Sequence, residues 1–201
     1  MGGRGAYSAT AKAKKAAKVQ KSHVTPEDVA AAGGPAAYIA KELGVTPERA
    51  KEYADAVTGW SGSDYSAIRK YFLGTLGKIH GDWIDKRAED LQSFIEAAPK
   101  WDGGTTYRCE GGHHAAGLVV GQTFTAEAPA SWSTSKTSAS AFGKTMFICK
   151  TQKKGTSIQG FSGFANEKEV LVGKDAKYKV TKIYNGTGKY SSFKYIEVEE
   201  V

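Results

Sequence analysis

The sequence predicts an α+β fold in which a helical N-terminal half packs on a mixed or antiparallel sheet. Up to about residue 100, apolar residues recur three and four positions apart, which is the spacing of an amphipathic helix. Beyond that point, short runs rich in β-branched and aromatic residues alternate with glycine-containing turns. Helices grouped before strands are typical of the α+β class.

The chain of 201 residues divides by composition into a basic tail, a helical part and a β-rich core. The tail, residues 1–24, holds six basic residues and no acidic one, which accounts for most of the net charge of +7. The remainder holds 22 basic and 21 acidic residues, so its charge does not predict a phosphate-binding surface. We expect a flexible tail that makes weak contact with nucleic acid or another acidic surface. The helical part is expected to cover 25–100 and the core 101–201.

Five helices are predicted from their start and stop signals. Two of them begin at a Thr-Pro pair, Thr25-Pro26 and Thr46-Pro47, with threonine as the N-cap and proline at the first helical position. Gly44 stops the helix that lies between these two. The predicted helices begin at Pro26 and Pro47 and cover 35–43, 63–73 and 81–98, the last of them closed by Pro99.

Strands are predicted in the second half of the chain from runs of valine, isoleucine, threonine, tyrosine and phenylalanine. The last two strands are expected to be joined by a hairpin turn at Asn185-Gly186 with Gly188. The predicted ranges are 105–110, 119–127, 144–151, 167–173, 177–184 and 193–201.

Several protein classes are excluded by side-chain content and by the length of apolar runs. Cys109 and Cys149 are too few for a disulfide scaffold, and free thiols are the favoured interpretation. His113 and His114 lack metal-ligand spacing, so we expect no metal. The start of the chain lacks the apolar stretch of a signal peptide, and no run reaches the roughly 20 residues of a transmembrane helix. We expect synthesis in the cytoplasm and no membrane partner, with virion association and delivery to a target cell both open.

Three short motifs contain candidate site residues. Glu167 and Glu169 are two positions apart, so in a strand both carboxylates point to one face, as a catalytic pair or as a solvated strand edge. Arg108 precedes two glycines, and its planar guanidinium suits bidentate contact with phosphate, although pairing with an acid on a strand edge is the alternative. The run 133–135, Ser-Thr-Ser, carries hydroxyls that either orient a carboxylate or cap the next helix. A glycine-rich loop over 155–166, with Phe161 and Phe164 expected to be exposed, leads into the glutamates, as in a mobile recognition element.

The order of these motifs resembles that of mono-ADP-ribosyltransferases, in the branch of bacterial exoenzymes and phage enzymes with Arg, Ser-Thr-Ser and Glu-x-Glu. The resemblance covers residues 104–201. It implies a core of two small sheets that binds NAD, the substrate, in a cleft between them. No Rossmann glycine motif follows a strand here, which agrees with that family. The residues it assigns to NAD are Tyr107, Arg108, Ser133, Thr134, Ser135, Phe142 and Glu169.

The resemblance also implies separate roles for these side chains. Arg108 contacts the phosphates, Ser133 orients the catalytic carboxylate, and Thr134 and Ser135 support the strand. Glu169 stabilises the oxocarbenium-like transition state as nicotinamide leaves. Phe142 packs near nicotinamide, with a core position as its alternative.

Glu167 and Phe164 are implied to serve the acceptor, which would be an arginine of an unidentified protein. A guanidinium is always charged in water and is a poor nucleophile, so a carboxylate is needed to orient it and accept its proton. Cys109 stands where the family often has glycine or a second arginine, so no second phosphate contact is assigned. We predict arginine-specific mono-ADP-ribosylation. The alternatives are NAD hydrolysis on the same fold and a non-enzymatic phage structural domain that binds nucleic acid.

Overall fold

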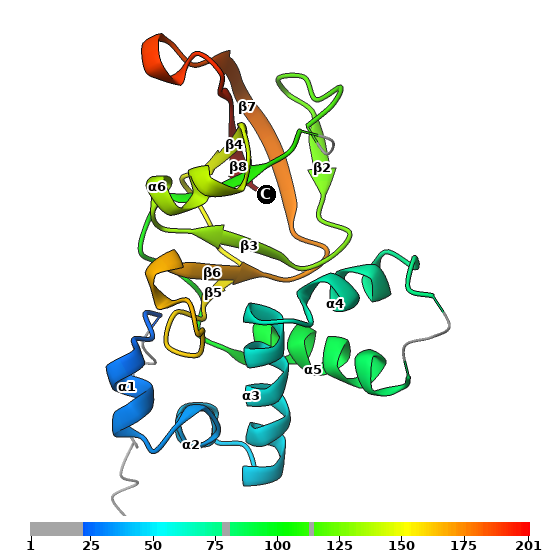
Figure 1. The fold of residues 1–201 in the computed structure, drawn as a ribbon, viewed down its shortest axis with the longest axis vertical. Helices are drawn as coiled ribbons and strands as arrows, with labels where there is room; N and C mark the ends of the chain where they lie inside the picture. Colours follow the sequence, from blue (N-terminus) through cyan, green and yellow to red (C-terminus); the bar gives the residue numbers. More distant parts are fainter. Residues whose placement is uncertain (1–21, 78–80, 113–114) are drawn as a thin grey trace, which may run out of the picture.

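The structure is a computed structural model that describes residues 22–77, 81–112 and 115–201. The predictions for the tail up to residue 21 and for His113 and His114 lie outside these residues. In the described part, six α-helices and one eight-stranded sheet form an α+β fold. Figure 1 shows the first five helices gathered below one end of the sheet. The predicted fold class is confirmed.

The helical part matches the predicted helices closely. The side chain of Thr25 accepts a hydrogen bond from the Asp28 amide in a capping box, and Thr46 caps its helix in a similar way. Gly44 adopts a left-handed conformation with a φ of 67° at a helix C-terminus, as its role as a stop signal requires. The helices are α1 (Pro26–Ala31), α2 (Pro35–Leu43), α3 (Pro47–Ser61), α4 (Tyr65–Phe72) and α5 (Trp83–Ala97).

The sheet is mixed, with strand order β2-β7-β8-β4-β1-β3-β6-β5. The β4–β8 pair is parallel, whereas the other neighbouring strands run antiparallel. The strands are β1 (Thr106–Glu110), β2 (Thr123–Thr125), β3 (Ala130–Ser133), β4 (Thr145–Cys149), β5 (Gly155–Ser157), β6 (Glu169–Val172), β7 (Lys177–Asn185) and β8 (Lys194–Glu200). Short helical turns complete the core: α6 (Lys136–Ala139), η1 (Ser140–Phe142), η2 (Ala165–Glu167) and η3 (Gly188–Tyr190).

The predicted strand ranges differ from the observed strands in several places. They contain no strand at the position of β3, and the strand expected over 119–127 is reduced to β2. The strand expected over 167–173 begins at Glu169, because Lys168 adopts a left-handed conformation with a φ of 52° and turns the chain. The segment 155–157 was predicted as part of a loop and instead forms β5, which pairs with β6. Its residues Gly, Thr and Ser are weak strand formers, so pairing with the buried β6 overrides local preference.

The two expected sheets are one continuous sheet within the described residues. It consists of two groups of strands, β2-β7-β8-β4-β1 and β3-β6-β5, which meet where β1 pairs with β3. That pairing consists of the residue pair Tyr107–Ser133, whereas β1 and β4 are paired over their whole length. The sheet is therefore nearly divided at the point where the Arg and Ser-Thr-Ser motifs meet.

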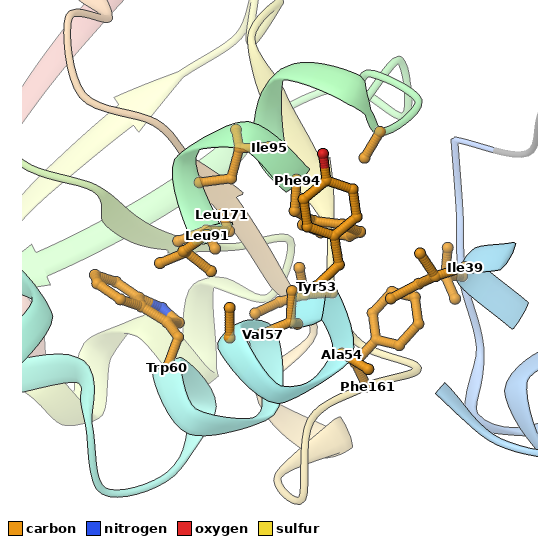
Figure 2. Close-up of a cluster of buried hydrophobic side chains, with 14 of the residues drawn as sticks. Ile39, Tyr53, Ala54, Val57, Trp60, Leu91, Phe94, Ile95, Phe161 and Leu171 are labelled. Carbon is orange, nitrogen blue, oxygen red and sulfur yellow. The ribbon is translucent and has the colours of Figure 1, made fainter. Parts of the chain in front are cut away.

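The helical part and the β-rich core share one apolar cluster. Phe161, which was expected to be exposed, is instead buried with 6% of its surface exposed. Leu171 of β6 and Phe161 from the preceding loop pack with Val57 of α3 and with Leu91 and Phe94 of α5. Figure 2 shows these side chains converging from the helices and from β6. This shared cluster fixes α3 against β6, which is the strand that begins with Glu169. None of the helices in the described ranges is long and apolar enough to cross a membrane.

Candidate active site

A cleft of about 510 Å³ lies between α3, α4 and the strands β1, β3 and β6. It brings together most of the predicted site residues, although they come from three separate segments of the core. The predicted residues that line it are Tyr107, Arg108, Ser133, Phe142, Phe164, Glu167 and Glu169. Thr134 and Ser135 do not line it. The Thr134 amide donates to the Lys168 carbonyl oxygen, and the Ser135 hydroxyl caps α6, as the capping alternative predicted.

Glu169 is a buried carboxyl at the start of β6, with 5% of its surface exposed. The indole Nε1–H of Trp60 donates to its Oε1 over 3.0 Å. Burial raises the pKa of Glu169 above its ordinary value, and the charge of Glu167 acts in the same direction. Hydrogen bonds from Ser131 and Trp60 and the charge of Arg108 oppose that shift. The site therefore holds a desolvated carboxyl beside a cavity, with nearby donors that favour its ionised form.

Ser133 holds the backbone that carries Glu167. Its hydroxyl donates to the Glu167 carbonyl oxygen over 2.5 Å and accepts from the Ser135 amide over 2.9 Å. Ser133 is also the register partner of Glu169 across β3 and β6. The hydroxyl beside the Glu169 carboxylate is that of Ser131, two residues earlier on β3.

Glu167 and Glu169 reach the cleft without lying on one strand face. Glu167 ends η2, Lys168 turns the chain, and Glu169 begins β6. Both carboxylates nevertheless line the same cavity. The predicted convergence is observed, and its cause is a strained turn held by Ser133 rather than the two-residue period of a strand.

Arg108 lies on β1 and faces a second arginine from the helical part. Its Nη1 donates to the Ser131 carbonyl oxygen over 2.9 Å, and its Nε lies 3.9 Å from a Glu110 carboxylate oxygen. Arg69 of α4 donates to the Pro129 carbonyl oxygen over 2.7 Å and lines the same cleft. Burial lowers the pKa of Arg108, and the charge of Arg69 lowers it further. Two guanidinium groups that are desolvated and repel each other favour a bound anion.

A second cavity of about 240 Å³ meets the cleft at these arginines. The two cavities share Arg69, Arg108, Glu110 and Trp132. Glu110 Oε1 is buried and has no hydrogen-bond partner among the described residues. The junction of the two cavities is therefore the most strongly charged part of the site and has unused hydrogen-bonding capacity.

Exposed aromatic rings surround the mouth of the cleft. Phe142 is 60% exposed, Phe164 is 55% exposed and Tyr65 is similarly open. The core alternative for Phe142 is therefore wrong. Cys109 also lines the cleft, and burial raises the pKa of its thiol to about 11, so it is neutral at ordinary pH and does not replace an arginine.

Sequence reasoning assigned no site residue to the helical half, yet Trp60, Tyr65 and Arg69 line the cleft. Trp60 follows Tyr53 and Val57 at helical spacing, which places it on the apolar face of its helix and does not indicate a site. Tyr65 and Arg69 are four residues apart on α4 and therefore share a face, which is the one sequence signal that could have grouped them. Their meeting with β1 and β6 depends on packing between segments distant in the sequence.

Comparison with solved structures shows the same fold in several bacterial proteins. The Vis toxin, an ADP-ribosyltransferase from Vibrio splendidus, is 23% identical, with a TM-score of 0.61 over 88% of this chain and 81% of that one. Exoenzyme S from Pseudomonas aeruginosa, solved with human 14-3-3 protein beta and carba-NAD, is 17% identical, with a TM-score of 0.60 over 85% and 89%. The enzymatic component C2-I of the C2 toxin from Clostridium botulinum is 21% identical, with a TM-score of 0.61 over 81% of this chain and 47% of that one.

Among proteins with curated descriptions, none is significantly similar to this chain. The family model of the ADP-ribosyltransferase exoenzymes matches residues 13–201, which is nearly the whole chain. Family and fold together support NAD-dependent mono-ADP-ribosylation, in agreement with the cleft and its buried carboxylate. This chain belongs to the ADP-ribosyltransferase exoenzyme family.

Proposed function

We propose that the protein transfers ADP-ribose from NAD to an arginine side chain of an acceptor protein and releases nicotinamide. The observation that carries this proposal is that Glu169 and Glu167 line one cleft with the paired guanidiniums of Arg108 and Arg69. The cleft thus combines two cations for a diphosphate, a buried carboxylate for a developing positive charge and a second carboxylate for an acceptor.

The pyrophosphate of NAD fits the junction of the two cavities in charge. Arg69 and Arg108 would hold it, because a bound diphosphate supplies the negative charge that the two desolvated guanidiniums lack. The two cavities on either side would take the two nucleoside halves of the dinucleotide. Arg69 would then provide the second phosphate contact that Cys109 cannot.

Glu169 would act on the glycosidic bond between ribose and nicotinamide. As that bond breaks, its electron pair leaves with nicotinamide, and positive charge develops on the ribose. A carboxylate in a cleft of low dielectric stabilises that charge more strongly than one in water does. Glu169 must be ionised to do so and to accept a hydrogen bond from a ribose hydroxyl.

Glu167 would orient the acceptor guanidinium and accept its proton as the new bond forms. Glu167 lines the cleft together with the exposed Phe164, where a protein surface has access. The Vis structure solved with agmatine, a compound with a guanidinium group, supports this acceptor class by analogy. Vis and C2-I are described as toxins, which supports delivery to a target cell for this chain also.

The test is nicotinamide release from NAD by the purified protein, measured with and without agmatine or a cell lysate. Wild type is expected to release nicotinamide and to label arginine acceptors. Glu169→Gln is expected to lose both activities, and Glu167→Gln to keep hydrolysis while losing acceptor labelling. Hydrolysis without labelling in the wild type would instead establish an NAD glycohydrolase. No release under any condition would contradict the proposal.

A further inference from the structure

The hydrogen bond between Trp60 and Glu169 connects the helical part to the buried carboxylate. Trp60 is the penultimate residue of α3, and its Nε1 lies 3.0 Å from Glu169 Oε1 and 3.1 Å from the hydroxyl oxygen of Ser131. Trp60 is 3% exposed and Glu169 is 5% exposed, so water does not compete for this contact.

The indole ring is held in place by the same strand that carries the carboxylate. Trp60 belongs to the apolar cluster that contains Leu91 of α5 and Leu171 of β6, and Figure 2 shows its ring beside both. Leu171 is two residues after Glu169. Because packing already fixes the ring, the hydrogen bond orders the carboxylate with little further loss of side-chain entropy.

The chemistry of the contact favours the state that the reaction needs. An indole N–H can only donate, so it stabilises an ionised carboxylate that accepts. The charged groups that face Glu169 are Glu167 of η2, which disfavours the ionised form, and Arg108 of β1, which favours it. Burial also opposes ionisation, so the donors from Trp60 and Ser131 offset part of its effect.

Resting on the proposed function, we propose that Trp60 is a positioning residue that holds the Glu169 carboxylate in place for catalysis. The indole engages Oε1 of that carboxylate directly. The helical part is then a component of the catalytic site as well as a packing partner. If Trp60 were only a core residue whose N–H needs an acceptor, its removal would change stability and nothing else.

The first experiment compares Trp60→Phe with Trp101→Phe in the full chain. Trp101 is a matched control, because it is buried and donates its indole N–H to the Gly104 carbonyl oxygen over 3.0 Å, outside the cleft. For Trp60→Phe we expect kcat for nicotinamide release to fall roughly tenfold to a hundredfold, as for the loss of a hydrogen bond to a charged group. KM for NAD should change little, and the acid limb of the kcat profile should move to higher pH. Equal kcat and equal pH profiles for the two variants would overturn the proposal.

The second experiment does not depend on turnover. In wild type, the NMR signal of the Trp60 indole N–H, identified by its absence from Trp60→Phe, should shift with pH as Glu169 titrates, because this N–H donates to the carboxylate. In Glu169→Gln that shift should disappear. A wild type without NAD turnover overturns the proposed function, whereas this titration still decides the Trp60 contact. An indole signal that responds neither to pH nor to Glu169→Gln overturns the role of Trp60, even where turnover is normal.

Discussion

Arg69 is the residue on which the proposed phosphate site most depends. Arg69 supplies a second cation beside Arg108. It belongs to α4, which contains none of the three sequence motifs. Arg69→Ala is expected to raise KM for NAD roughly tenfold to a hundredfold with a smaller effect on kcat, because a phosphate contact is present in both the ground state and the transition state. Initial-rate kinetics of nicotinamide release measure both constants.

The matched control for that variant is Arg49→Ala. Arg49 of α3 pairs with Glu52 on the same helix and with Asp90 of α5, and it lines neither cavity. The Arg49→Ala variant should therefore have the same KM for NAD as the wild type. A similar rise in KM in both variants would show that Arg69 acts through stability rather than through contact with NAD.

Glu169 links stability to pH. Because its folded-state pKa is raised, the folded protein binds more protons than the unfolded chain between the ordinary glutamate pKa and the raised one. The free energy of unfolding therefore falls as pH rises through that window, and the ionised carboxylate costs stability at neutral pH. Glu169→Gln should raise Tm at neutral pH, and this gain should shrink at about pH 4. Thermal unfolding of the wild type and of Glu169→Gln at both pH values checks this. A Tm gain in acid that equals or exceeds the gain at neutral pH would contradict it.

At the scale of single residues, the motifs predicted correctly which residues meet in the site. They were less accurate about which atoms contact each other there. Arg108, Ser133, Glu167 and Glu169 meet in one cleft, as their order along the chain indicated. The hydroxyl expected beside the Glu169 carboxylate was that of Ser133, yet the nearest one belongs to Ser131. A one-dimensional motif does not specify which of two serines on the same strand face approaches a neighbour, since this depends on how β3 and β6 twist against each other.

Among the secondary-structure elements, η1 is held unusually close to β1. A Cβ atom at Gly143, which follows η1, would lie 2.2 Å from the Glu110 carbonyl oxygen. Gly143→Ala should therefore displace η1 and its exposed Phe142, with a loss of about 1 to 3 kcal/mol in the free energy of unfolding. Gly163→Ala is the control, because a Cβ at that position meets nothing within 4 Å. Urea unfolding of the two variants checks this, and equal stabilities would contradict the close approach.

The helices were predicted more accurately than the strands, for a local reason. The helix ends depend on nearby residues: Thr25 and Thr46 cap the N-termini of their helices, and Gly44 ends another. Such capping residues can be recognised from a few consecutive residues of sequence. β5 and the late start of β6 depend instead on a partner strand and on the left-handed Lys168. The hairpin predicted at Asn185-Gly186 does join β7 and β8, through a longer connection that contains η3.

For the whole molecule, the shared apolar cluster predicts cooperative unfolding of the helical part and the core. Leu171 is fully buried in that cluster, and Leu171→Ala is expected to cost about 2 to 5 kcal/mol. Leu73→Ala, at a half-exposed position after α4, should change stability by less than about 0.5 kcal/mol. When Leu171→Ala is unfolded, the circular dichroism signals of the helices and of the aromatic side chains should still change with one common midpoint. Separate midpoints would mean that the two parts fold independently.

The order of the motifs was sufficient to identify the family, the fold class and the carboxylate pair, because these depend on side-chain chemistry and on local hydrogen-bonding patterns. The contribution of the helical part was not predictable in that way. Trp60 and Arg69 look like an ordinary core residue and an ordinary surface cation in the sequence, and they become site residues only where α3 and α4 pack against β6 and β1. That placement arises from the packing of Leu171 against Val57 and Leu91, which lie far earlier in the chain. Contacts between such distant residues produce no repeating pattern in the sequence.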